Sequence, residues 1–315
     1  MKKIHYSNLN NYYTNLNSFL KEKYGEKVLR ICIDGGFTCP NRDGTCGKGG
    51  CIFCNERGAG EYLDGSNSIA RQVYDACQKM EKTRNAQKFI AYFQNFTGTH
   101  GSVECLESKY NQALIDNRIV ALAIATRPDC ISQEIIDLLT KIRNEKGIDI
   151  WIELGLQTIH DKTADLINRC YKTQLFYDIV DKLRSNGIDI VVHLMMGLPG
   201  ETREDMLASI VKVSTLDIQG IKFHNVNIMK KTKLADMFFS GKYKPLELAE
   251  YISILAEGVA LLPPHVVIHR LVSDCNPDYL IAPNWASDKF LMLTEITKKF
   301  VTDNVYQGRD YKHHQ

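Results

Sequence analysis

The sequence of 315 residues lacks any apolar run near the eighteen or so residues that a bilayer-spanning helix needs. It also lacks a charged-then-apolar leader at its start, so we expect a cytoplasmic protein with no membrane partner. Proline- or serine-rich linkers, low-complexity tracts and internal repeats are missing too, and nothing marks a clean domain boundary. One large core is therefore expected, because a single α/β barrel with appendages fits this length.

A strong excess of one charge is also missing. The formal net charge is +2, and the sequence pI of about 8.0 is below the value above about 9 that nucleic-acid-binding domains commonly show. Lys230 and Lys231 form a local basic pair, for which a solvated loop is favoured over contact with phosphate. The charge balance favours a small-molecule substrate and leaves RNA open.

Cysteine, by contrast, is abundant, with ten residues, four of them in the loop CPNRDGTCGKGGCIFC at 39–54. In a reducing compartment, clustered cysteines bind metal more often than they form disulfides. The Cys51-x-x-Cys54 knuckle suits zinc, but zinc sites usually join two such knuckles, and the spacing from Cys39 through Cys46 supplies no second one. A four-iron four-sulfur cluster held by three cysteines would instead leave one iron open to bind a ligand.

Six short β-branched or apolar runs recur along the chain, and each is typical of a strand buried on both faces. They lie at residues 28–34, 88–94, 120–126, 148–156, 188–196 and 220–228. Helical patterns fall between them, with apolar residues spaced i, i+3, i+4 and i+7. These residues are Ile135, Leu138, Leu139 and Ile142 in one segment, and Phe176, Ile179, Val180 and Leu183 before Gly187 in another. Thr202 and Asp205 resemble a capping box that opens a further helix.

This alternation predicts an α/β fold with right-handed crossovers and a parallel sheet, either curled as a full or partial barrel or open and doubly wound. In both forms ligands gather at the C-terminal ends of the strands. We expect an N-terminal extension at 1–27, a core at 28–243 and a C-terminal extension at 244–315. The last carries two more helical patterns around residues 266–274 and is expected to close the barrel or its mouth.

The cysteine triplet, with Phe53 before its last member and a first strand ahead of it, resembles the radical S-adenosylmethionine (SAM) superfamily. More narrowly, the chain resembles the YhcC-like family, which is related to the elongator catalytic subunit. The resemblance rests on the sequence stretches CPNRDG, GGCIFCN, AYFQNFTGT, TRPDC, ELGLQT, INR, HLMMGLPGET, IKFH, IHRL and LIAPNW. They cover nearly the whole chain. The resemblance implies a partial (β/α)6 TIM-like barrel.

The resemblance also implies the chemistry. Cys39, Cys51 and Cys54 would ligate a [4Fe-4S] cluster whose open iron binds S-adenosylmethionine, while Cys46 stays outside the triplet. One electron, from a donor such as flavodoxin or ferredoxin, would cleave the cofactor to a deoxyadenosyl radical that abstracts hydrogen from substrate. The protein's tasks are then to position the reactants and to exclude water and oxygen.

By position, the resemblance implies that a further set of residues frames S-adenosylmethionine. These are Phe53, Gln94, Thr97, Thr126, Gln157, Arg169, His193 and Gly197. Arg169 is expected to pair with the carboxylate bidentately, with a surface ion pair as the alternative. His193 is expected to reach the ribose, with a hydrogen-bonded core histidine as the alternative, and Gly197 would leave room for adenine.

The substrate end departs from the family pattern. Cys170 and Tyr171 replace a Gly-His pair, and Asn227 replaces a histidine on the sixth strand. The candidate substrate-binding residues are His224, Asn225, Asn227, His269, Arg270 and Asp274. Asn225 and Asn227 share one strand face and offer amide donors and acceptors to the edge of a heterocyclic base, with His224 on the opposite face and the inward face undecided.

A branch resembling this family acts in 7-deazaguanine salvage. We therefore expect a carbon–nitrogen lyase that cleaves queuine and releases 7-aminomethyl-7-deazaguanine (preQ1). Radical modification of a tRNA wobble base is the alternative reaction, and a non-catalytic zinc- or cluster-binding scaffold is the alternative of another class. Tyr171 or Cys170 could quench the product radical, as could solvent or a buffer thiol.

Overall fold

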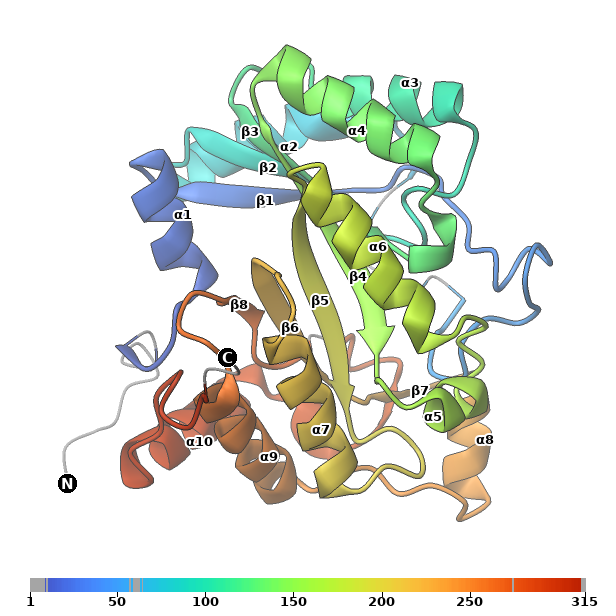
Figure 1. The fold of residues 1–315 in the computed structure, drawn as a ribbon, viewed down its shortest axis with the longest axis vertical. Helices are drawn as coiled ribbons and strands as arrows, with labels where there is room; N and C mark the ends of the chain where they lie inside the picture. Colours follow the sequence, from blue (N-terminus) through green and yellow to red (C-terminus); the bar gives the residue numbers. More distant parts are fainter. Residues whose placement is uncertain are drawn as a thin grey trace.

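A curled sheet of seven parallel strands forms the centre of the molecule (Figure 1). The structure is a computed structural model that describes residues 9, 11–56, 58, 63, 65–273 and 275–312. The strands lie in the order β1-β2-β3-β4-β5-β6-β8, and each neighbouring pair runs parallel. Their bounds are Val28–Ile33 (β1), Lys88–Phe93 (β2), Ile119–Thr126 (β3), Asp149–Gln157 (β4), Asp189–Met196 (β5), Gly220–Asn225 (β6) and Val267–Arg270 (β8). The predicted α/β fold with a partial parallel barrel is confirmed.

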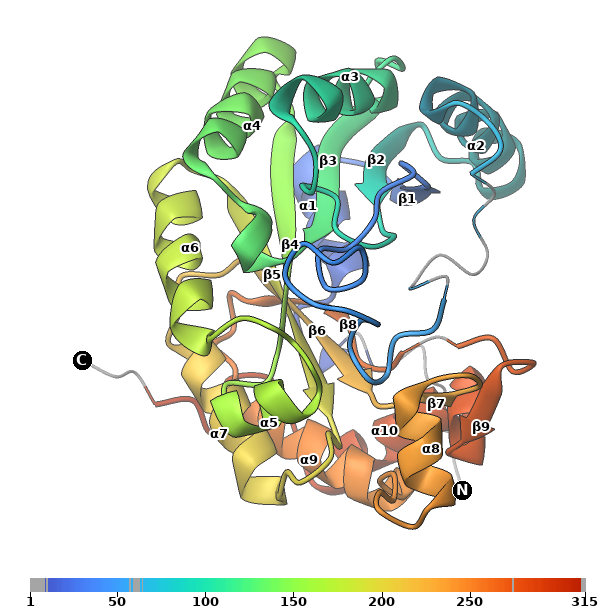
Figure 2. The ribbon, with the colours of Figure 1, turned by 90° about the vertical axis from the view of Figure 1, so that its right-hand side faces the viewer.

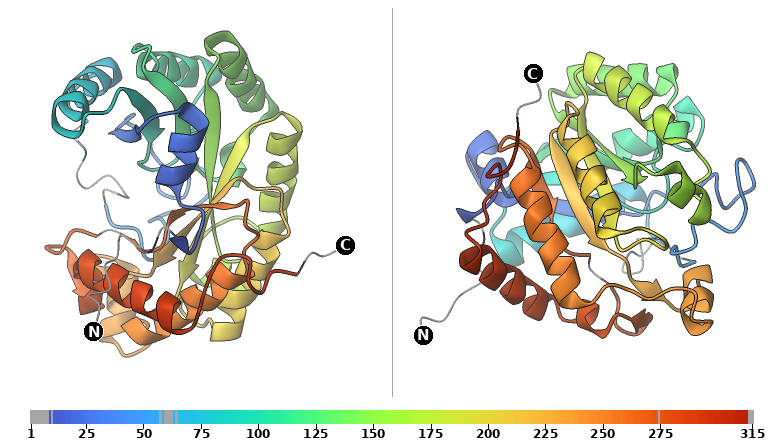
Figure 3. Two further views of the ribbon diagram at one scale, coloured as in Figure 1. Left: turned by 90° about the vertical axis from the view of Figure 1, so that its left-hand side faces the viewer. Right: turned by 60° about the horizontal axis from the view of Figure 1, so that its bottom comes forward.

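Helices cover the outer face of this sheet (Figures 1 and 3). The longer ones are α2 (Ile69–Arg84), α3 (Val103–Ala113), α4 (Gln133–Lys146), α6 (Thr173–Ser185), α7 (Arg203–Ser214), α9 (Leu248–Leu261) and α10 (Lys289–Thr302). The shorter elements are α1 (Leu16–Tyr24), η2 (Pro128–Cys130), α5 (Asp161–Leu166), β7 (Ile228–Met229), α8 (Lys233–Phe239), β9 (Leu280–Ala282) and η3 (Asn284–Ser287). In the described part of the chain, no helix combines the length and apolarity that a membrane span requires.

Local sequence explains where these helices form. The apolar residues predicted at helical spacing in α4 and α6 are all buried against the sheet. The capping box that opens α7 is confirmed, because the Thr202 hydroxyl accepts from the Asp205 backbone N–H at 3.2 Å and the Asp205 carboxylate accepts from the Thr202 N–H at 2.9 Å. These bonds satisfy two helix-end donors that would otherwise lack partners.

The inner face of the sheet is layered. At its N-terminal end, Leu20 of α1 packs on Ala121, Ala123 and Trp151, so α1 closes that end of the barrel. Alanines at consecutive inward positions of β3 are too small to fill the space above this layer. A polar layer and then an open cavity follow toward the C-terminal ends of the strands, where ligands bind in such folds.

The C-terminal extension is part of the sheet, so the prediction of six strands is incomplete. Its strand β8 pairs with β6, and Arg30 Nη2 on β1 lies 2.6 Å from His269 Nδ1 on β8, which joins the two edge strands. One core cluster runs from Leu9 to Val305, so both predicted extensions contribute to it. The four-residue β8 was missed because His269 and Arg270 interrupt its apolar run.

Candidate functional site

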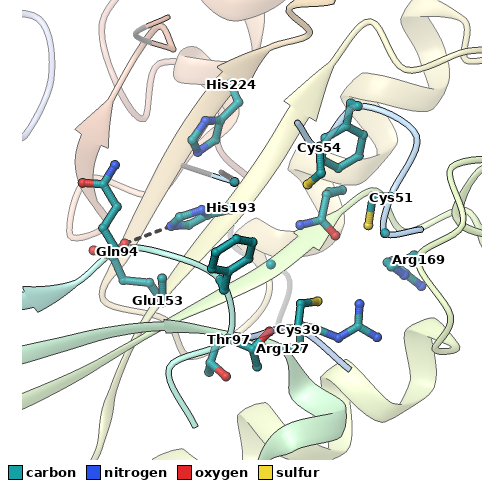
Figure 4. A pocket seen from close by; sticks show the side chains of 18 of the residues that line it. Cys39, Cys51, Cys54, Gln94, Thr97, Arg127, Glu153, Arg169, His193 and His224 are labelled. Carbon is teal, nitrogen blue, oxygen red and sulfur yellow. Dashed lines mark hydrogen bonds and ion pairs between the residues drawn. The ribbon is translucent and has the colours of Figure 1, made fainter. Parts of the chain in front are cut away.

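Two adjoining cavities lie at the C-terminal ends of the strands. The cysteine cavity holds about 240 Å³ and contains the three predicted cluster cysteines in its wall (Figure 4). The second cavity holds about 620 Å³ and extends toward Asn225, Asn227 and Ser273. Residues lining both are Phe53, Cys54, Gly58, Gln94, Gln157, His193, His224 and Arg270. The two cavities are therefore neighbours that share one wall.

The cysteine loop is shaped by two polar side chains at its start. The main-chain carbonyl of Asn41 accepts from the Gly50 N–H at 2.8 Å, and the side-chain amide Nδ2 of Asn41 lies 3.7 Å from Cys51 Sγ. Arg42 Nη2 donates to the Cys54 carbonyl at 3.1 Å. Gly50 has φ +75°, a left-handed conformation that favours glycine. The loop therefore wraps around its own polar core and exposes three thiols to the cavity.

The donor set fits a polynuclear cluster. Cys39, Cys51 and Cys54 face one cavity, yet among the described residues no three His, Cys, Asp or Glu side chains are grouped closely enough to hold a single metal ion. A hydrogen bond from Cys51 and the charge of Arg42 lower the pKa of the Cys54 thiol, against the effect of burial. The same hydrogen bond and burial raise the pKa of the Cys51 thiol, so the two thiols share one proton between them. Three cysteines without a fourth protein ligand fit an iron–sulfur cluster with one open iron better than a closed tetrahedral zinc site.

Arg127, at the end of β3, is a cation of this cavity that the sequence prediction missed. Its Nε and Nη2 donate to the Asp129 carboxylate at 2.9 and 2.6 Å, and its guanidinium lies 5.1 Å from the centre of the Tyr171 ring. Its positive charge acts on the thiols of Cys39 and Cys51. Arg127 is therefore placed to stabilise anionic groups in the cysteine cavity.

Arg169 lines the same cavity, but its guanidinium donates hydrogen bonds to main-chain carbonyls. Its Nη1 donates to the carbonyls of Leu156 and Thr158 at 2.7 and 2.8 Å, and its Nη2 to the Tyr171 carbonyl at 3.1 Å. The residue is 1% exposed. To pair with a cofactor carboxylate, Arg169 would have to give up one of these bonds. Arg127 would not, because its Nη1 has no hydrogen-bond partner among the described residues.

A buried ionic layer forms the floor of the cysteine cavity. The Glu153 carboxylate accepts hydrogen bonds from Lys222 Nζ, from the Tyr92 hydroxyl at 2.5 Å and from His193 Nε2 at 3.1 Å. Arg30 Nη2 lies 3.7 Å from its other oxygen. Burial alone would raise the pKa of Glu153, but the charges of Lys222 and Arg30 lower it well below its usual value. Glu153 therefore stays ionised.

Burial and these cations also set the protonation of the neighbouring bases. Burial lowers the pKa of Lys222 to about 7, although Glu153 opposes the shift. Burial likewise lowers the pKa of His193 to about 4. Neutral His193 must then donate its Nε2 hydrogen to Glu153, which leaves Nδ1 as an acceptor. The His193 ring lies 5.0 Å from that of His224, at the junction of the two cavities (Figure 4).

The second cavity has a polar wall at the end of β6. The Ser273 backbone N–H donates to Asn225 Oδ1 at 2.8 Å, and Asn225 Nδ2 donates to Asn227 Oδ1 at 2.6 Å. The Ser273 hydroxyl lies 3.2 Å from the Asn225 carbonyl and 3.2 Å from His224 Nδ1. With the hydroxyl hydrogen on the Asn225 carbonyl, His224 carries its hydrogen on Nδ1 and its Nε2 is an acceptor. Asn227 lines this cavity, and the buried His224 Nε2 has no hydrogen-bond partner within the described part of the chain.

Most predicted site residues line these cavities. Those in the cysteine cavity are Cys39, Cys51, Cys54, Phe53, Gln94, Thr97, Thr126, Gln157, Arg169 and His193. Those in the second cavity include His224, Asn225, Asn227 and Arg270. His224 and Asn225 are neighbours on β6, and both line this cavity together with Asn227.

Two predicted residues lie elsewhere, and a third is not described. His269 contacts Arg30 and the Trp151 ring, where it joins the edges of the barrel. Gly197 packs against Leu246 outside both cavities, and its carbonyl accepts from the Tyr243 hydroxyl at 2.6 Å. Asp274 falls outside the described residues.

The missed residues had a sequence signal. Glu153 lies in the interior of the strongly apolar strand sequence IDIWIELGL, whose other charge, Asp149, stands at the strand start, and Lys222 is the single Lys, Arg, Asp or Glu of GIKFHNVNI. A charge in a strand buried on both faces needs an opposite charge, so the two could have been paired. Tyr171 was predicted as a possible radical quencher, but its hydroxyl donates to the Gly155 carbonyl. Cys170 lies on the exposed side of the loop that follows α5.

Comparison with known proteins agrees with this geometry. A model described as "Radical SAM superfamily" matches residues 41–212, and one described as "Radical_SAM C-terminal domain" matches residues 218–301. Uncharacterized protein YtqA of Bacillus subtilis is 37% identical over 98% of this chain and 95% of its own, and protein YhcC of Escherichia coli is 35% identical over 92% of each. The solved structure of the archaeal Methanocaldococcus infernus Elp3 superposes with a TM-score of 0.70 at 18% identity. It covers 89% of this chain and 64% of its own.

Proposed function

The chain belongs to the radical SAM superfamily, and from this premise we propose that it is a queuine lyase that releases preQ1 from the free base. The observation that carries the substrate class is the pair of ligand-facing groups at the end of β6. Asn227 offers amide hydrogens, and His224 Nε2 offers a lone pair. One donor beside one acceptor matches the lactam edge of a guanine-like base, which presents a carbonyl acceptor beside an N–H donor.

The cofactor would bind in the cysteine cavity. Cys39, Cys51 and Cys54 would hold the [4Fe-4S] cluster, which together with S-adenosylmethionine supplies a radical that abstracts hydrogen from substrate. Arg127 would stabilise the negative charge of the thiolates and of the cofactor carboxylate. Phe53 and Gln94 stand in the wall shared with the second cavity, where they would separate and align the two ligands.

The second cavity suits queuine in size, because its volume of about 620 Å³ lies within the range of roughly 300–1,000 Å³ usual for small-molecule sites. The base would lie against Asn227 and His224, with its cyclopentenediol toward His193 and the cysteine cavity. The ring would lose one hydrogen atom to 5′-deoxyadenosine, and the bond between the aminomethyl nitrogen and the cyclopentene carbon would break. The nitrogen would then take up one electron from the low-potential donor and one proton from solvent, which gives preQ1. The neutral acceptor His193 Nδ1 is placed to orient a ring hydroxyl.

The test compares substrates directly. Reconstituted, reduced enzyme with S-adenosylmethionine is incubated either with queuine or with queuosine-containing bulk tRNA, and preQ1 and 5′-deoxyadenosine are measured by mass spectrometry. We expect both products from the free base. Turnover on tRNA without turnover on the free base would instead support radical modification of a tRNA wobble base, and one bound zinc without deoxyadenosine would support the non-catalytic scaffold.

A further inference from the structure

The short helix α8 covers the outer side of the cysteine loop. The Leu234 N–H donates to the Ile52 carbonyl at 3.0 Å, and both side chains belong to a small buried cluster that Phe53 joins. On the same side, a Cβ placed on Gly49 would lie 3.7 Å from Lys233 Nζ. Figure 2 shows α8 beside the loop at the open end of the barrel. The surface of α8 is therefore separated from the proposed cluster by little more than one layer of side chains.

This surface has a local excess of positive charge. Residues 230–247 carry five lysines against two carboxylates, an excess larger than the formal net charge of +2 for the whole chain. We define the lysine face by its exposed lysines, which are Lys48, Lys230, Lys231, Lys233, Lys242 and Lys244. Phe239, the last residue of α8, is 72% exposed. Only Lys244 has a carboxylate partner among the described residues, Glu247 at 3.2 Å.

We propose that the lysine face docks the acidic redox protein that delivers the electron to the cluster. This inference rests on the proposed radical SAM function. In the step itself, the reduced donor loses one electron and the cluster held by Cys39, Cys51 and Cys54 gains it, with no bond made or broken. Electron transfer becomes steeply slower with distance, so a donor is best placed where the cover over the cluster is thin, as it is at α8.

The composition of the face favours a protein over RNA. Residues 230–247 contain five lysines and no arginine, and lysine is a strongly hydrated point charge, whereas arginine is preferred for bidentate contacts to phosphate and for stacking. A single exposed aromatic, Phe239, provides no series of stacking platforms for bases. Transient redox complexes, in contrast, are small and are steered by complementary charge.

The test measures 5′-deoxyadenosine from reconstituted enzyme and S-adenosylmethionine, with either reduced flavodoxin or dithionite as electron donor. Lys230→Glu/Lys233→Glu reverses the lysine face. Lys82→Glu/Lys146→Glu makes the same change of charge on α2 and α4, away from the loop. We expect the first variant to lose about tenfold or more of its flavodoxin-driven rate, since charge steering is worth 10- to 1,000-fold, while its dithionite-driven rate stays within about twofold. The control should retain both rates.

Other outcomes overturn the inference. A flavodoxin-driven rate that the reversal leaves unchanged, or an equal loss with both donors, would show that the face does not receive the electron. Loss of tRNA binding with an unchanged flavodoxin rate would make it an RNA-binding face. If wild type forms no deoxyadenosine even with dithionite, the proposed function fails and this inference with it. A normal dithionite rate separates that failure from failure of docking alone.

Discussion

Glu153 on β4 and Lys222 on β6 form an ion pair that is buried from solvent on the floor of the cysteine cavity. His193 on β5 and Tyr92 on β2 also bond to the Glu153 carboxylate. These contacts therefore link four strands beneath the proposed reaction site. They fix the position of His193, which stands at the junction of the two cavities.

Replacing one partner of this pair should destabilise the protein strongly. Glu153→Gln leaves Arg30 without its buried counter-charge and removes the carboxylate that raises the pKa of Lys222, so Lys222 loses its charge and its ion pair. The loss of one buried partner typically costs about 3–5 kcal/mol. We expect a loss of that order in the free energy of unfolding, measured in urea. The double variant Glu153→Gln/Lys222→Met should recover part of it. A loss below about 1 kcal/mol for the single variant would show that the pair behaves like an exposed one.

The stability should also depend on pH through His193. Its pKa is lowered from 6.5 to about 4 in the folded protein by burial. Between pH 6.5 and about pH 4, His193 is protonated in the unfolded chain but neutral in the folded protein. Acidification across this window therefore favours the unfolded chain and lowers the free energy of unfolding. The contribution reaches about 3 kcal/mol. Urea unfolding at several pH values should show that the stability difference between wild type and His193→Asn shrinks toward acid. A constant difference would contradict the assigned neutral state.

The three cavity cysteines should be distinct from the fourth cysteine of the loop. Cys39→Ser, Cys51→Ser and Cys54→Ser are each expected to lose most of the reconstituted iron, because a three-thiolate site has no spare ligand. Cys46 lies on the exposed side of the loop near Arg127 and Asp129, so Cys46→Ser should keep about four irons per chain. Iron analysis and electron paramagnetic resonance of the reduced protein decide the matter. Equal iron in all four variants would exclude the assigned ligands.

The polar wall of the second cavity should set affinity for substrate. Asn227→Ala removes a ligand-facing donor, and Asn225→Ala removes the bond that holds Asn227 in place. Each change should raise KM for queuine about tenfold, as expected when one buried polar partner is lost, and leave deoxyadenosine formation without substrate unchanged. Asn144→Ala, on exposed α4, is the matched control. A fall in kcat with unchanged KM would mean that these residues do not bind the base.

Local patterns carried much of this fold. Strands such as β4 and β5 were predictable because a parallel strand buried on both faces is a nearly continuous apolar run. Helices α4 and α6 were predictable from their spacing of apolar residues. The strand β8 was not predictable, because His269 and Arg270 interrupt its four residues. The contact that places it is between His269 and Arg30, which are 239 residues apart in the sequence. Only the curled sheet brings the two edges together.

In the site, as in the fold, features that are local in sequence were predictable and contacts between distant residues were not. The cysteine triplet and its loop are contiguous in sequence, so their common purpose was visible without a structure. Arg169 was predicted to bind a carboxylate, but the turn after β4 uses its guanidinium to satisfy main-chain carbonyls. Arg127, which the sequence prediction did not name, lines the same cysteine cavity as Arg169. Which of two arginines faces a ligand depends on loop geometry that spacing does not encode.

The most direct measurement uses queuine deuterated on its cyclopentenediol ring, with the reduced, reconstituted enzyme and S-adenosylmethionine. We predict that deuterium appears in 5′-deoxyadenosine as preQ1 is released, because the bound ring would lie between His193 and the cofactor. Deoxyadenosine that stays free of deuterium while preQ1 is released, or an absence of preQ1, would contradict it.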